Sequence, residues 1–152
     1  MTLARDLARP YPTVRVDDDA QDAARLLIRE RLPALLVLDQ VDCPYAIVPT
    51  AQLLGTLTPE SDPLDPLLTL IADRLDDGAQ ETLSGRSVAD WLPRRRATPG
   101  LVGPEDSPSE VAALMTRKDC PVVAVIERDG GAVTLLGAIT ANVLLEHFIG
   151  GP

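Results

Sequence analysis

The chain contains an internal repeat, and this repeat restricts the possible folds more than any other feature of the sequence. Residues 22–39 (DAARLLIRERLPALLVLD) align without a gap to residues 110–127 (EVAALMTRKDCPVVAVIE), 88 positions further along the chain. Five aligned pairs are identical, against roughly one expected by chance from ordinary residue usage. Because repeated units bury their apolar faces against one another, the sequence predicts one molecule built from two related halves.

Both copies predict the same order of elements. A capping side chain, Asp19 or Ser107, stands three residues before a carboxylate and indicates a helix start. A proline, Pro33 or Pro121, ends each helical segment, and the apolar runs that follow predict strands covered on both faces. The predicted strands, turns and closing helices are 34–38, 39–42, 45–48 and 51–57 in the first copy, and 122–126, 127–131, 133–139 and 141–148 in the second.

Further helices are predicted outside and within the repeat. Short helices are expected ahead of the copies, at 3–8 and 87–92. In the helix of the first copy, the apolar residues 23, 24, 27 and 28 form one predicted buried face. The connection between the copies is rich in Pro and Asp, and its apolar residues recur at helical spacing: Leu64, Leu67, Leu68, Ile71 and Leu75. We therefore divide the chain into a first motif (1–58), an acidic connecting segment with a helix (59–86) and a second motif (87–152).

The composition argues against several classes of function. The net charge of −9 disfavours nucleic-acid binding, because phosphate backbones are bound by basic surfaces. No apolar run approaches the ~20 residues that span a bilayer, and the N-terminus lacks the pattern of a signal peptide. We therefore expect a cytoplasmic protein without membrane insertion. His147 has no nucleophile near it in sequence, and Cys43 and Cys120 lack metal-ligand spacing, so we expect no catalytic residues and no metal site.

The arrangement resembles the cystathionine-β-synthase (CBS) domain pair, or Bateman module. The segments that carry the resemblance are RLPALLVLD and DCPVVAVIE, followed by YAIVPTAQLL and LLGAITANVLL. The resemblance implies an α/β (α+β) fold of two β-α-β-β-α repeats, related by a pseudo-twofold axis and separated by two clefts. It further implies a homodimer without catalytic activity, and no cofactor other than a regulatory adenosyl ligand such as AMP, ADP, ATP or S-adenosylmethionine.

The resemblance also assigns roles to residues at the closing helices. In the family, a Thr or Ser at the helix start touches phosphate, and an Asp three residues later binds the ribose diol. The second copy keeps Gly137 and Thr140 but has Val143 at the Asp position. The first copy has Pro49 and Gln52 at these two positions, and Pro49 lacks both a hydroxyl and an N–H. Neither copy therefore has the complete pair.

The second cleft is the favoured ligand site. Arg94–Arg96 enter its first strand and supply local positive charge in an acidic chain, and the family geometry would let them reach a phosphate near Thr140. The residues assigned to this cleft are Arg94, Arg95, Arg96, Thr98, Leu101, Val102, Cys120, Pro121, Val122, Gly137, Thr140 and Val143. The residues assigned to the weaker first cleft are Thr13, Val14, Leu32, Pro33, Ala34, Pro49 and Gln52. As alternatives, Thr140 only caps its own helix, Gln52 is an exposed helix residue, and the arginines form a solvated loop.

Two functions stay open at this point. In the first, the module senses an adenosyl ligand and acts on a partner such as a separately encoded enzyme or transporter. In the second, it is a ligand-independent module for dimerisation or protein interaction, with degraded nucleotide clefts. Thr140 and the arginine run favour the first function, whereas Pro49 and Val143 favour the second.

Overall fold

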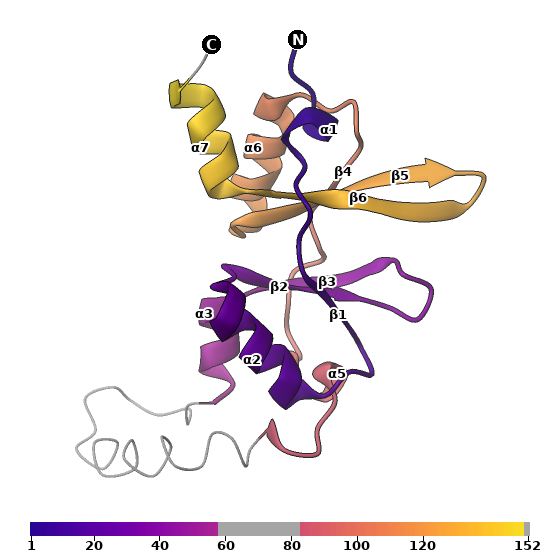
Figure 1. The fold of residues 1–152 in the computed structure, drawn as a ribbon, viewed down its shortest axis with the longest axis vertical. Helices are drawn as coiled ribbons and strands as arrows, with labels where there is room; N and C mark the ends of the chain where they lie inside the picture. Colours follow the sequence, from indigo (N-terminus) through magenta and orange to yellow (C-terminus); the bar gives the residue numbers. More distant parts are fainter. Residues whose placement is uncertain (58–82, 151–152) are drawn as a thin grey trace.

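The computed structural model describes residues 1–57 and 83–150, which form two halves stacked one above the other (Figure 1). Each half contains one three-stranded sheet, and the two hairpins project in the same direction. The helix predicted between Leu64 and Leu75 lies outside the described residues. Within the described part of the chain, no helix is long and apolar enough to cross a membrane.

The two halves have the same topology. The first comprises β1 (Thr13–Arg15), α2 (Ala20–Glu30), β2 (Ala34–Leu38), β3 (Pro44–Pro49) and α3 (Thr50–Gly55). The second comprises β4 (Leu101–Val102), α6 (Pro108–Lys118), β5 (Val122–Asp129), β6 (Ala132–Thr140) and α7 (Ala141–Gly150). In each sheet the middle strand pairs in parallel with the first strand and antiparallel with the third. The predicted fold of two β-α-β-β-α repeats is confirmed.

Local signals in the sequence set the ends of α2 and α6. The Asp19 carboxylate accepts a hydrogen bond from the Asp22 N–H, and the Ser107 hydroxyl accepts one from the Glu110 N–H, both at 3.2 Å. These bonds satisfy donors that a helix start otherwise leaves unpaired. Both helices end at a residue in the left-handed region, Arg31 or Asp119, two residues before the proline that the sequence predicts as the end of the helical segment.

Apolar side chains pack on both faces of each sheet. Every residue of β2 is buried, and so are the first five residues of β5, as the continuous apolar runs predict. One face of each sheet packs against the helices of its own half. The other faces meet in a core between the sheets, which contains Ala34, Leu36, Ile47, Val122, Ala124 and Ala138. This shared core joins the halves.

Two details differ from the sequence prediction. The predicted turn 127–131 is largely strand, because β5 continues to Asp129 and only Gly130 and Gly131 form the tip, both with positive φ. The extension is exposed and therefore lacks the apolar pattern that predicts a strand. Ile28, predicted to lie on the buried face of its helix, is 77% exposed.

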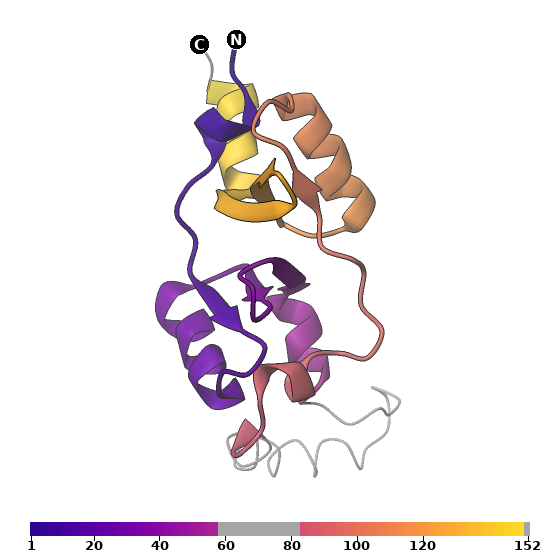
Figure 2. The same ribbon diagram turned by 90° about the vertical axis from the view of Figure 1, so that its right-hand side faces the viewer.

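The short helices that precede the two copies are exchanged between the halves. α1 (Ala4–Leu7) packs into the core of the second half, whereas α5 (Val88–Trp91) packs into the core of the first. Figure 2 shows the consequence, since the chain crosses between the halves once on each side, through residues 8–12 and through residues 93–100. These two crossing segments flank the space between the sheets.

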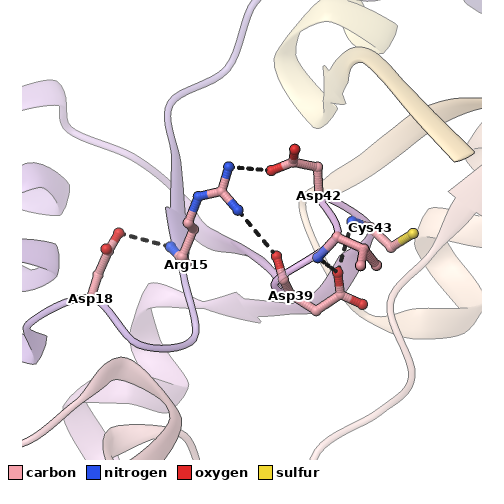
Figure 3. Close-up of polar contacts among 6 residues, drawn as sticks. Arg15, Asp18, Asp39, Asp42 and Cys43 are labelled. Carbon is pink, nitrogen blue, oxygen red and sulfur yellow. Dashed lines mark hydrogen bonds and ion pairs between the residues drawn. The ribbon is translucent and has the colours of Figure 1, made fainter.

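A polar cluster fixes the β2–β3 turn to the end of β1 (Figure 3). The Arg15 guanidinium forms an ion pair with Asp42 and donates to the Asp39 carbonyl at 3.5 Å. The Asp39 carboxylate accepts from the N–H groups of Val41 and Cys43 at 2.9 and 3.0 Å. These carboxylates close a turn, and no group of metal-ligating side chains occurs among the residues whose placement is described.

Candidate ligand-binding site

The arginine run lies beside the first half. Residues Pro93–Ala97 and Gln52 line an open hollow of about 720 Å³, and Thr140 does not belong to its lining. The position follows from α5, because Val88, Trp91 and Leu92 are buried in the first core and the arginines begin two residues later. The sequence predicts that the arginines lie near Thr140, whereas the structure brings them together with Gln52 of the other copy.

The three arginines differ in their surroundings. Arg96 is half-buried, its guanidinium lies 5.0 Å from the centre of the Tyr45 ring, and it donates to the Pro93 carbonyl at 3.0 Å. This stacking holds Arg96 against β3. Arg94 and Arg95 are exposed, and within residues 1–57 and 83–150 neither forms an ion pair. Their charges are therefore available to an anion in the hollow.

A fourth cation reaches the same crossing segment. The Lys118 ammonium, at the end of α6, donates to the Thr98 hydroxyl at 2.6 Å. Thr98 was predicted as a site residue, whereas Lys118 was not, because its contact with Thr98 depends on tertiary structure. Lys118 is the one lysine of the chain. Residues 94–98 thus carry or contact four cationic side chains in a protein of net charge −9.

Thr140 has a structural role at its helix. Its hydroxyl oxygen accepts a hydrogen bond from the Val143 N–H at 3.3 Å, as a cap does. At the corresponding position of the first copy, Pro49 provides no such bond. Thr50 instead uses its hydroxyl to donate to the Leu32 carbonyl at 2.8 Å. The capping role of Thr140 uses a lone pair, and the hydroxyl proton stays free for another acceptor.

Gly137 also has a structural explanation. The backbone of Arg9 pairs with Ala138 through two hydrogen bonds of 2.9 and 3.0 Å, so the N-terminal crossing segment runs along β6. A Cβ atom on Gly137 would lie 2.8 Å from the Arg9 carbonyl oxygen, and the Gly137 φ of 155° is unusual for other residues. The glycine allows this close approach of two backbones.

Several predicted site residues belong to the cores, although Leu101 and Val102 also line a second hollow of about 300 Å³. Val14, Leu32, Ala34, Val102 and Val122 are each at most 9% exposed. The carbonyl groups of Pro33 and Pro121 accept from the first helical N–H groups of α3 and α7, at 3.0 and 2.8 Å. Thr13 and Leu101 are half-buried strand residues. Val143 packs partly buried against the second core.

Tyr11, in the N-terminal crossing segment, is not among the residues that the sequence assigns to a site. Its hydroxyl donates to the Ala34 carbonyl at 2.5 Å and accepts from the Ala34 N–H at 3.4 Å. Burial raises the pKa of Tyr11 to about 12, and the nearby Cys120 adds to the increase although the Ala34 bond opposes it. Burial likewise raises the pKa of the Cys120 thiol. The repeat offset of 88 aligns Tyr11 with Pro99. This difference between the copies is the one sequence feature that could have drawn attention to Tyr11.

Comparisons with known proteins agree with this architecture. A family model of the CBS domain matches residues 4–58. A crystal structure of a CBS-domain-containing protein from Kribbella flavida is 35% identical, with a TM-score of 0.80, and the match covers 98% of this chain and 99% of that one. The chain belongs to the CBS-domain proteins. No curated protein matches the sequence.

More distant structures share the CBS fold. The CBSX2 structure in complex with AMP is 20% identical, with a TM-score of 0.63 over 97% of this chain and 96% of that chain. The CBS domain of a bacterial CNNM/CorC family Mg²⁺ transporter, in complex with ATP, is 17% identical with a TM-score of 0.65. That match covers 99% of this chain and 89% of that chain. At sequence identities of 17–20%, these similarities show a shared fold and nothing further.

Proposed function

We propose that the protein is a non-catalytic regulatory CBS module that binds an adenine nucleotide and acts on a separate partner protein. The observation that carries the proposal is the open hollow in which Arg94 and Arg95 face solvent beside Gln52. Exposed guanidinium groups form strong charge-assisted hydrogen bonds with phosphate. The AMP and ATP complexes of CBSX2 and of the transporter domain support a nucleotide as the anion.

The arrangement favours phosphates over the nucleoside as the main source of affinity. Gln52 stands where the family has its ribose-binding Asp, and an amide is a weaker acceptor for a diol than a carboxylate. The acidic chain repels an anion at long range, so the local cations have to supply the attraction. We therefore expect ATP and ADP to bind more tightly than AMP, and adenosine to bind weakly.

A thermal-shift panel of ATP, ADP, AMP, S-adenosylmethionine and adenosine tests this proposal. Arg95→Ala should weaken ATP binding about three- to tenfold, because one exposed charge contact contributes about 1 kcal/mol, and should leave adenosine unchanged. Arg25→Ala is the control, since it removes another exposed arginine, which lies on α2 and pairs with Asp22, and changes the net charge by the same amount. Equal losses of ATP affinity in both variants would indicate a general charge effect and contradict a phosphate site at Arg95.

A second function, ligand-independent protein interaction, is favoured by a different observation. Leu145, Phe148 and Ile149 on α7 are 54, 51 and 80% exposed, although Leu144 is buried. An apolar helix face of this kind is typical of an interaction surface. A panel in which none of the five compounds stabilises the protein would favour this function over nucleotide sensing.

A further inference from the structure

An apolar groove of about 130 Å³ lies on the helical face of the first half, between α2, α3 and α5. The buried side chains of Leu27, Leu53 and Trp91 form its floor. Ile28 and Leu54 form its rim, and they are 77 and 60% exposed. Large aliphatic side chains exposed around an apolar groove are typical of a docking surface.

The second half does not repeat this rim. The repeat offset of 88 aligns Ile28 with Thr116 of α6. Thr116 is exposed, and its hydroxyl donates to the Ala112 carbonyl at 2.9 Å. A polar side chain therefore serves at this position of the fold, so folding alone does not require the exposed Ile28.

The connecting segment begins and ends beside the groove. Leu57, the last described residue before the segment, lines the groove. Leu83, the first described residue after it, is 4% exposed in the core that also contains Trp91. The segment is thus attached at both ends to the half that carries the groove, and its local concentration there is high.

The length of the segment also fits the groove. Residues 58–63 reach up to about 20 Å when they are extended, at about 3.3 Å per residue. The helix that the sequence predicts over residues 64–75 is about 18 Å long, and α2, with 11 residues, is about 16 Å long. Such a helix can therefore lie along α2 without leaving the first half.

The predicted helix has one apolar face that matches the lining of the groove. Leu64, Leu67, Leu68, Ile71 and Leu75 recur at helical spacing and fall on one side. An apolar stripe of this width is stable in water when it is buried against another apolar surface.

We propose that the groove between α2, α3 and α5 binds residues 64–75 of the same chain through the apolar face of their predicted helix. This contact covers Ile28 and Leu54 and leaves the exposed apolar face of α7 as the surface for another molecule. The helices of the two halves thus have different partners. The inference is independent of nucleotide binding, because neither the groove nor the segment includes Arg94 or Arg95.

Limited trypsin digestion of the full chain, followed by mass spectrometry, tests the proposal. Arg74 is the one trypsin site within residues 58–82, and a helix bound in the groove is protected from cleavage. Ile28→Asp and Leu54→Asp change exposed side chains of the groove. Each should speed cleavage after Arg74 about tenfold or more, because burial of one large aliphatic side chain favours the bound form by at least that factor.

Thr116→Asp is the matched control for Ile28→Asp, because it introduces the same charge at the aligned position of α6 and should leave the rate of cleavage unchanged. Equal rates of cleavage after Arg74 in the wild type and in both groove variants would overturn the proposal. So would an equal acceleration in Thr116→Asp. Protection of the wild type that weakens on dilution would also overturn it, since that result indicates a second copy of the chain in the groove.

A second pair of variants leaves the groove intact. Leu68→Asp places a charge on the apolar face of the predicted helix, whereas Thr69→Asp places the same charge on the polar side. Leu68→Asp should speed cleavage after Arg74 about tenfold, and Thr69→Asp should not. Equal rates in these two variants would contradict docking through the apolar face.

Discussion

Gly137 illustrates how a residue assigned to a ligand by sequence has a packing role in the structure. The glycine lies where Arg9 of the N-terminal crossing segment pairs with β6. Its missing side chain lets the Arg9 carbonyl approach the backbone closely. The sequence could not reveal this role, because Arg9 and Gly137 are distant in the chain and meet only when α1 docks on the second half.

Gly137→Ala should therefore destabilise the protein by about 1–3 kcal/mol, through a clash at 2.8 Å and an unfavourable φ. The free energy of unfolding, measured by urea denaturation, checks this expectation. Gly55→Ala is the control, because a Cβ there meets nothing within 4 Å and a helical alanine should be neutral or stabilise by up to about 1 kcal/mol. Similar changes in the free energy of unfolding for both variants would contradict the expectation that the close backbone approach requires glycine at position 137.

At the scale of elements, local signals were sufficient where they coincided with burial. The caps at Asp19 and Ser107, and the apolar runs after Pro33 and Pro121, predicted α2, α6, β2 and the buried part of β5. The exposed part of β5 was not predicted, because a strand that is exposed on both faces does not show the pattern of apolar residues by which strands are recognised. Helix and strand boundaries that depend on burial were thus predictable, and the hairpin beyond the core was not.

Thr140→Ala should destabilise the protein by about 0.5–2 kcal/mol, because α7 loses the acceptor for the Val143 N–H. Thr140→Ser keeps the hydroxyl and should retain most of the stability. Thermal unfolding of the two variants measures how much the capping hydrogen bond stabilises the protein. Titration with ATP shows whether Thr140 also contacts the ligand. Since the arginine hollow does not include Thr140, both variants should bind ATP as the wild type does. A selective loss of ATP affinity in Thr140→Ala would place the phosphate near α7 instead.

At the scale of the molecule, the exchange of α1 and α5 decides which residues meet. Each short helix packs on the other copy, so each crossing segment approaches residues that the repeat does not place near it in sequence. The arginines were predicted as a ligand group, but their neighbour Gln52 was assigned to the other cleft. The sequence predicted the arginines as ligand residues because of their charge. It could not predict that Gln52 lies beside them, because that contact depends on long-range packing.

Self-association is a further expectation at this scale. The exposed Leu145, Phe148 and Ile149 lead us to expect a homodimer of twofold symmetry. Light scattering at high micromolar concentration should give twice the chain mass, and Phe148→Asp should shift the population toward monomer. Val41→Asp, at the exposed β2–β3 turn, serves as a control and should leave the dimer unchanged. A monomeric wild type would contradict this expectation.

Isothermal titration of the wild-type protein with ATP tests the central claim most directly. A nucleotide-sensing module should give a saturable heat, with adenosine at least about tenfold weaker because it lacks the phosphates that we propose to bind at Arg94 and Arg95. Added salt should weaken ATP binding, since exposed charges are screened beyond about 8 Å at physiological ionic strength. The absence of any saturable heat with millimolar ATP would contradict nucleotide sensing and leave the protein as an interaction module.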